Sequence, residues 1–155
     1  MPTTLLDELR QRRPFASLAE EVHLNLVRTE AVLQEGLDHV LKPYGVSATQ
    51  YNVLRILRGA GPEGLCRQEI RDRLLTRMPD VTRLLDRMEE AGLVSRARDS
   101  EDRRLVTTHL TDRGRELVDS LDQPVADEHE RRLGHLGEEQ LRTLVQLLSL
   151  VRHPE

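Results

Sequence analysis

The chain has 155 residues, a formal net charge of −4 and only three aromatic side chains, Phe15, Tyr44 and Tyr51. This length is typical of one domain, and the single cysteine, Cys66, excludes a disulfide within the chain. No stretch approaches the roughly 18 apolar residues that a membrane helix needs, and residues 1–15 lack the apolar segment of a signal peptide. We therefore expect a single cytoplasmic domain with an aliphatic core and no membrane contact.

The first predicted helix covers residues 17–42. Its leucines and valines recur mostly every four positions, which places them on one helix face. Ser17, with Glu20 three residues later, predicts a capping box at its start. Pro43 and Gly45 predict its end, because proline cannot continue a helix and glycine readily adopts the left-handed conformation that follows one.

The next three predicted helices include a pair joined by a tight turn. A helix over residues 47–58 comes first and is followed by the turn-forming residues 59–64. Short helices over 66–75 and 79–91 come next, and we expect Pro79 at the first helical position, where its missing N–H costs nothing. Two short helices connected in this way are typical of a helix-turn-helix.

A β-hairpin is predicted directly after this pair. Residues 93–98 and 105–110 are β-prone runs, and they flank the charged stretch RDSEDRR. A helix-turn-helix followed by a hairpin is a winged helix. The expected fold is therefore mainly α-helical, with a small β-hairpin as the wing.

Two further helices are predicted at the C-terminal end. Thr111 is expected to cap a helix that runs to about residue 133 and bends near Pro124. The last helix covers residues 138–152 and carries an apolar stripe so wide that it needs more than one partner surface. This stripe consists of Leu141, Leu144, Val145, Leu148 and Val151, widened by Leu147 and Leu150. It predicts a homodimer, and the alternative is a well-buried last helix in a monomer.

The helix over residues 79–91 has a polar face that is suited to DNA. At 100° per residue, Val81, Leu84, Leu85 and Met88 share the inward face. The opposite face and the preceding turn carry the side chains that we expect to contact the major groove or its phosphates. They are Arg77, Pro79, Thr82, Arg83, Asp86 and Arg87. The alternative is that these are ordinary solvated side chains, with the arginines paired to nearby acids.

The charged tip between the two strands suits a minor groove. Residues 65–104 carry about 10 arginines and about 9 acids, which makes them the least acidic part of the chain. Arginines on a wing can enter a narrow minor groove, where the negative potential is enhanced. Asp99, Glu101 and Asp102 fit this use if one acid holds an arginine in position. The alternative is a polar turn whose charges neutralise each other.

The run DSEDRRLVTTHLTDRG resembles the wing signature of the MarR family of bacterial transcription regulators. The family pattern is Asp-x-Arg, an apolar β run, Leu-Thr, two residues and Gly, which extends here from Asp102 and Arg104 to Gly114. Residues 81–96 resemble that family's recognition helix with its exit into the wing, and residues 49–57 resemble the helix before the DNA-binding unit. The likeness covers most of the chain.

This resemblance implies roles for residues at the wing tip. Arg104 would be the arginine in the minor groove, Asp102 would be the acid that orients it, and Arg103 would be a further DNA contact. The partner would be an operator duplex with a pseudo-palindromic sequence, whose half-sites lie about one helical turn apart.

The resemblance also implies a domain organisation. Residues 1–155 would form one domain, with residues 47–111 as the DNA-binding region. Residues 17–46 and 112–153 would supply the helices that pair two subunits.

A small-molecule effector is a further implication of the resemblance. It would bind between the dimer helices and the winged helix, where the candidate lining residues are His23, Arg28, Tyr44 and Tyr51. By hypothesis, the effector changes the spacing of the two recognition helices and releases DNA, so that the protein acts as a repressor. Tyr51 has an alternative place in the core.

Other chemistries find little support in the sequence. No nucleophile elbow, phosphate loop or paired-carboxylate motif appears, so we expect neither enzyme activity nor a cofactor. The six histidines lack the spacing of a helical metal clamp, and Cys66 is interpreted as structural rather than as a redox sensor. Two alternatives stay open. One is a winged-helix protein–protein module without DNA binding, which the net charge of −4 and Asp80 favour; the other is a metal-responsive switch.

Overall fold

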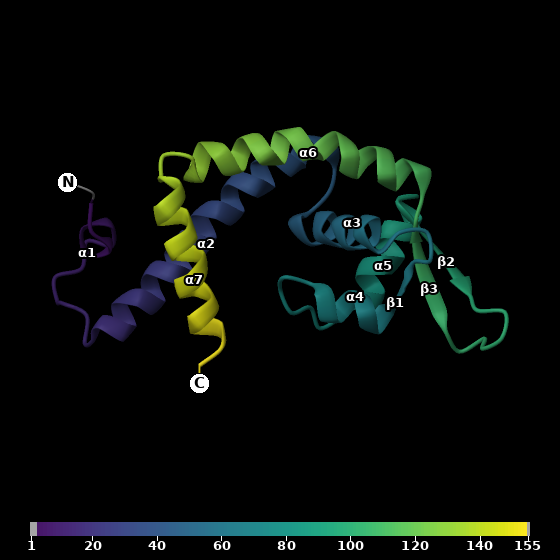
Figure 1. Ribbon diagram of the computed structural model, residues 1–155, viewed down its shortest axis with the longest axis horizontal. Coiled ribbons are helices and arrows are strands. Elements are labelled where there is room, and N and C mark those ends of the chain that lie inside the picture. The colour runs from purple at the N-terminus through teal and green to yellow at the C-terminus, as the bar shows by residue number, and fades with distance from the viewer. Residues whose placement is uncertain (1–2, 155) are drawn as a thin grey trace.

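The computed structural model describes residues 3–154, and Figure 1 shows their elements in chain order. They are the helices and strands α1 (Leu5–Glu8), α2 (Leu18–Leu41), the 3-10 turn η1 (Lys42–Tyr44), α3 (Ala48–Ala60), β1 (Leu65–Cys66), α4 (Arg67–Arg73), α5 (Val81–Glu90), β2 (Val94–Arg98), β3 (Val106–Leu110), α6 (Asp112–Leu133) and α7 (Glu138–Arg152). The predicted winged helix-turn-helix is confirmed.

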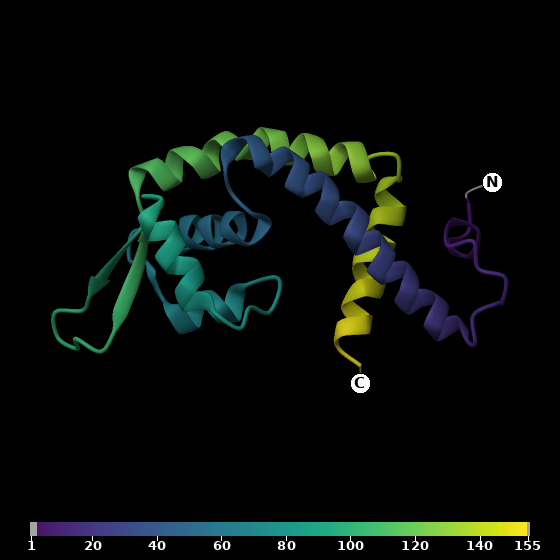
Figure 2. The same ribbon diagram turned by 180° about the vertical axis from the view of Figure 1, so that it is seen from behind.

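The described residues form two lobes (Figures 1 and 2). The winged lobe contains α3, α4, α5 and the three strands. The helical lobe contains α1, α7 and the N-terminal part of α2. The long helix α6 runs along one side of both lobes, from the wing to α7, and packs against α2 and α3 on the way. A change in the helical lobe can therefore reach the winged lobe through one continuous helix.

The apolar core lies in the winged lobe and under the part of α6 that covers it. The fully buried apolar side chains come from α3, α4, α5, β2 and α6, together with Leu41 at the end of α2. By contrast, α7 has no buried residue, and Gly36 and Leu41 are the only buried residues of α2. The helical lobe therefore keeps most of its apolar side chains outside the core.

Side-chain caps set the helix starts that the sequence predicts. The hydroxyl oxygens of Ser17, Ser47 and Thr111 each accept a hydrogen bond from the backbone N–H three residues later. The predicted capping box at Ser17 is only half formed, because the carboxylate of Glu20 accepts from the N–H of Ala16 instead. The chain then leaves α2 through η1 and a glycine of positive φ, as predicted.

The sheet has one strand more than the predicted hairpin. Its order is β1-β3-β2 with antiparallel pairs, so β3 is the central strand. Thr108 of β3 lies opposite Leu65 on one side and Arg96 on the other. The third strand was missed because Leu65–Cys66 is too short to show a period of two, and the helical pattern of α4 begins directly after it.

The helices α2 and α6 approach closely at Gly36. A Cβ at this buried glycine would collide with the carboxylate of Glu128 and with the guanidinium of Arg132. Glu128 is only 7% exposed and accepts hydrogen bonds from Arg131 and Arg132, which lower its pKa to about 2. The spacing of Arg131 and Arg132, three and four residues after Glu128, favours these ion pairs, but they were not predicted here, and the burial of Glu128 depends on tertiary packing.

The remaining differences concern the chain ends and α6. The short helix α1, which Thr4 caps, was not predicted. Pro124 lies within α6, which Figure 1 shows as one gently curved helix, in keeping with the predicted bend. No helix of residues 3–154 is long and apolar enough to cross a membrane.

Candidate nucleic-acid interface

The helix α5 separates its apolar and polar faces as the sequence predicts. Val81, Leu84, Leu85 and Met88 are buried against the core. The side chains of Thr82, Arg83 and Arg87 are exposed on the other face, and Arg77 and Pro79 are exposed in the turn before the helix. This surface therefore offers three arginines and one hydroxyl as hydrogen-bond donors.

The start of α5 differs from the expectation. Pro79 was expected at the first helical position, but it lies before the cap, and Val81 is the first helical residue. Asp80 is the N-cap, and its carboxylate accepts a hydrogen bond of 2.9 Å from the N–H of Arg83. The prediction was wrong because a good capping side chain outweighs the tolerance of proline at the next position. Asp80 therefore has a structural role at the place where an acid would otherwise be hard to explain near DNA.

Arg96 joins the wing to α5. Its guanidinium forms ion pairs with Asp86 and Glu89, and its backbone N–H donates to the carboxylate of Glu89 at 2.9 Å. The hydrogen bond from Arg96 lowers the pKa of Glu89. Asp86, which was predicted to face DNA, thus has a partner within the chain. The alternation of side chains along β2 could have placed Arg96 on the α5 side, but no sequence pattern predicts the two acids that receive it.

A second polar contact supports α5 from the other side. Nη1 of Arg67, the first residue of α4, donates a hydrogen bond of 2.9 Å to the hydroxyl oxygen of Thr82. These residues are 15 positions apart, which matches no local pattern, so Arg67 was not among the predicted site residues.

The carboxylates of the wing tip accept hydrogen bonds from its backbone N–H groups. The carboxylate of Asp99 accepts hydrogen bonds from the N–H groups of Glu101 and Asp102, which lower the pKa of Asp99. Asp102 in turn accepts from the backbone N–H of Arg104 at 3.0 Å. Asp102 was expected to orient the side chain of Arg104, whereas its bond in the structure goes to the main chain. The side chains of Arg103 and Arg104 are exposed at this tip.

The winged lobe is fixed to α6 by an ion cluster. Arg58 of α3 donates hydrogen bonds of 2.8 Å to Asp119 and 2.8 Å to Asp122, both on α6. The hydrogen bonds that Arg58 donates to Asp122 and Asp119 raise the pKa of Arg58, and the same contact lowers the pKa of Asp122. This contact holds α3, and with it the winged lobe, on the helix that leads to the helical lobe.

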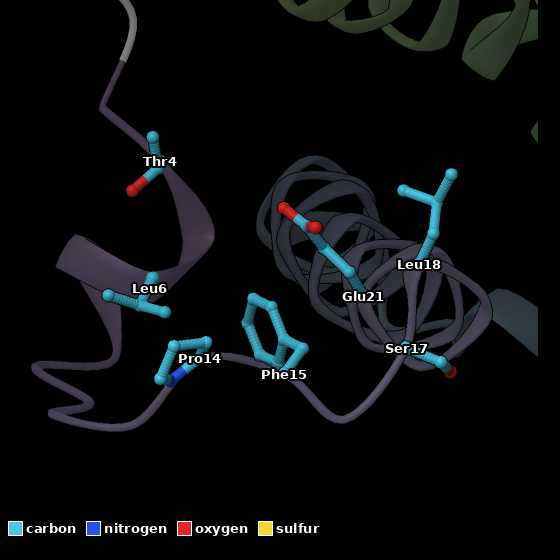
Figure 3. Close-up of a pocket in the computed structure, with 7 residues that line it drawn as sticks. All are labelled: Thr4, Leu6, Pro14, Phe15, Ser17, Leu18 and Glu21. Carbon is cyan, nitrogen blue, oxygen red and sulfur yellow. The ribbon is translucent and has the colours of Figure 1, made fainter.

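The four candidate effector residues are spread over the molecule. Tyr51 is 6% exposed in the core, and burial raises its pKa. Tyr44 lies half exposed in η1, and His23 and Arg28 are exposed on α2, where Arg28 pairs with Glu8 of α1 at 3.6 Å. None of the four lines the cavities between α1 and α2, along α7, or between α4, α5 and the wing. Figure 3 shows one of 430 Å³ between α1 and the start of α2, with the ring of Phe15 on its floor.

Cysteine and histidine side chains form no grouped metal site in the part of the chain that the structure describes. Cys66 is half buried at the start of α4. His109 contacts the carbonyl oxygen of Pro62 through Nδ1 at 3.2 Å, which attaches β3 to the loop before β1. Both residues are thus explained by local packing.

Comparison with known proteins finds transcription regulators, among them members of the MarR family. Residues 44–105 match the MarR family. A MarR transcription factor from Planctomyces limnophilus, solved by crystallography, is 43% identical, with a TM-score of 0.68 over 88% of this chain and 99% of that one. The transcriptional repressor CouR, solved with a 23-mer DNA duplex, is 30% identical, with a TM-score of 0.78 over 92% of this chain and 100% of that one. The uncharacterized HTH-type transcriptional regulator YkoM of Bacillus subtilis is 39% identical over 80 residues, which is 52% of this chain and about half, 51%, of YkoM.

Proposed function

Because the chain belongs to the MarR family of transcription regulators, we propose that it is a homodimeric repressor that binds a pseudo-palindromic operator. The helix α5 enters the major groove and the wing enters the adjacent minor groove. The observation that carries this proposal is the exposed arginine set on both elements, held on a rigid frame by the Arg96 ion pairs. CouR, which is described as a repressor and was solved with DNA, supports the same role.

The contacts divide between the two grooves. Thr82, Arg83 and Arg87 lie on the outer face of α5, where arginine can pair with guanine or phosphate and threonine can contact phosphate or a thymine methyl. Arg77 and Pro79 approach the backbone from the preceding turn. In the wing, Arg104 enters the minor groove and Arg103 lies beside it, on a tip whose shape Asp102 maintains. Asp86 contributes indirectly, because its ion pair with Arg96 helps to hold the wing against α5.

The open helical lobe supports the dimer. On α7, Val145, Leu147, Leu150 and Val151 are each more than half exposed, and on α2 Leu18 is 75% exposed. Apolar surface of this extent on the helices of one lobe is costly in water and is typical of an interface. Pairing of α2 and α7 across a two-fold axis would place two winged lobes on one duplex.

Release by an effector would act through α6. This helix contacts α2 in the helical lobe and receives Arg58 from the winged lobe. The dimer would have two arrangements that differ in the spacing of the two α5 helices. A ligand bound at the helical lobe shifts the equilibrium between them only by the difference in its binding free energy for the two arrangements.

The test is the binding of the purified protein to the DNA that flanks its own gene, measured at several salt concentrations. Arg83→Ala and Arg104→Ala are measured beside the wild type. We expect the wild type to bind one site tightly and to lose affinity steeply as the salt concentration rises. Both variants should no longer bind that site. Weak binding that is insensitive to sequence and unchanged in both variants would instead favour the protein–protein module.

A further inference from the structure

A cleft of 380 Å³ lies between α5, the start of α4 and the wing. Three arginines line it, Arg67, Arg96 and Arg104, together with the hydroxyl-bearing Thr82. No aspartate or glutamate is among the described residues that line it. In a chain with a net charge of −4, such a cleft is a local concentration of positive charge.

The three arginines are not equally available for a ligand. The guanidinium of Arg96 is engaged by Asp86 and Glu89, which neutralise it. Arg67 uses one N–H for Thr82, and a guanidinium has five N–H donors in a fixed planar arrangement. Because Arg67 donates to the oxygen of Thr82, the hydroxyl hydrogen of Thr82 points away from Arg67 and is free to donate. Both side chains therefore present donors, and neither presents a negative charge.

The position of the cleft identifies what it would receive. This step rests on the proposed function, in which α5 occupies a major groove and the wing an adjacent minor groove. Neighbouring grooves of a duplex are separated by one sugar-phosphate strand. That strand must then cross between α5 and the wing, in front of the cleft, and phosphate oxygens are acceptors that bind arginine and hydroxyl donors.

We propose that Arg67 is a DNA-contact residue of this protein, which binds the backbone phosphate between the two grooves together with Thr82. Arg67 therefore fixes the position of the protein on the duplex and carries no base preference. Its hydrogen bond also directs the hydroxyl of Thr82 toward the phosphate.

The experiment compares Arg67→Ala with wild type on two duplexes, the operator obtained by selection and a random sequence of the same length, each in a salt series. We expect Arg67→Ala to weaken binding to both duplexes by a similar factor, about tenfold. The slope of log affinity against log salt should fall by about 0.9 for each phosphate that the variant no longer neutralises, so by about 2 for a dimer. Arg67→Lys should keep most of the slope, because it keeps the charge.

Two controls make the result specific. Arg115→Ala removes an exposed arginine from the start of α6, which does not line the cleft, and should leave affinity and slope unchanged. Thr82→Val removes the hydroxyl but keeps the shape of the side chain. In a Thr82→Val background, Arg67→Ala should cost less than in the wild type, because the two side chains act on one phosphate.

Failure of this inference can be distinguished from failure of the proposed function. Suppose that Arg67→Ala binds DNA with the same affinity and salt slope as the control Arg115→Ala, while Arg83→Ala and Arg104→Ala no longer bind the operator. The phosphate contact is then refuted and the proposed function stands. A loss of affinity for the operator alone would also refute it, because it would make Arg67 a base reader. If Arg83→Ala and Arg104→Ala have no effect either, the proposed function itself fails.

Discussion

At the residue scale, Asp80 combines a structural benefit with an electrostatic cost. Its carboxylate caps α5 by accepting the N–H of Arg83, and a negative charge at this end also suits the helix dipole. The same charge lies beside the arginines that are proposed to contact DNA, where phosphates would repel it. We therefore expect Asp80 to stabilise α5 and to weaken DNA binding by α5.

The two effects of Asp80 separate on substitution. Asp80→Ala should lower the free energy of unfolding by about 1 kcal/mol, because the cap is lost. Asp80→Asn keeps a capping oxygen and removes the charge, so it should retain most of the stability and bind DNA more tightly than wild type. Urea denaturation and DNA titration at one salt concentration measure the two quantities. Weaker DNA binding by Asp80→Asn, with stability retained, would instead indicate that the carboxylate accepts a hydrogen bond from a base.

At the element scale, α6 connects the two lobes through ion pairs with α3 and a close approach to α2. Arg58 reaches it from α3, and the cluster of Glu128, Arg131 and Arg132 lies where α6 meets Gly36 of α2. Only a glycine at this point of α2 allows the carboxylate to lie so close, because any Cβ would occupy its place. The close approach of the two long helices at this point therefore requires a glycine at position 36.

The Glu128 cluster predicts a pH dependence of stability. The hydrogen bonds from Arg131 and Arg132 lower the pKa of Glu128 from 4.5 to about 2, so the folded state favours the ionised form. The resulting stability is fully present above about pH 4.5 and is lost as the pH falls toward 2. Glu128→Gln should be less stable than wild type at pH 7, and the difference should shrink on acidification. Denaturant unfolding at pH 7 and pH 3 measures it.

Glu130→Gln is the matched control, since it removes an exposed carboxylate from the same helix. A difference between wild type and Glu128→Gln that stays constant from pH 7 to pH 3 would contradict the assigned role of the cluster.

The sequence predicts elements well where the signal is local. Capping residues and periodic apolar positions located α2, α3, α6 and α7, and the β-prone runs located the hairpin. The strand β1 was missed because two residues carry no period, and the start of α5 was misplaced because two rules competed at Pro79 and Asp80. The polar contacts of Arg67 and Arg96 were missed for a different reason. They join residues whose proximity depends on helix packing or on the strand register. The ion pairs of Glu128 are local to α6, but its burial against Gly36 depends on how α2 packs on α6.

At the scale of the whole molecule, one subunit leaves its helical lobe incomplete. The wide apolar stripe that the sequence predicts on α7 is mostly exposed in the isolated chain. This is the expected result if a second subunit covers α7, and it disfavours the alternative of a well-buried last helix in a monomer. The dimer itself stays a prediction.

Val145→Asp tests the dimer. Val145 is 66% exposed in one subunit, so a charge there should cost the fold of the subunit little but should be unfavourable inside an apolar interface. We expect a monomer with near-native helix content and much weaker operator binding. Gln146→Asp, at the next position on α7, is the control and should remain a dimer. Sedimentation velocity measures both, and a dimeric Val145→Asp variant would contradict this interface.

The central claim is that α5 reads a major groove while Arg104 reads the adjacent minor groove. One measurement tests it most directly, the affinity for operators in which single A·T pairs are replaced by inosine·cytosine. This pair shows the minor-groove edge of A·T and the major-groove edge of G·C. Under the wing, the wild type should tolerate inosine·cytosine but not G·C, whereas under α5 inosine·cytosine should weaken binding.

Arg104→Ala should abolish the discrimination under the wing and leave that under α5 intact. The opposite pattern would contradict the account. In that case inosine·cytosine would weaken binding under the wing as much as G·C does, while positions under α5 would accept it, and the wing could not be a minor-groove reader.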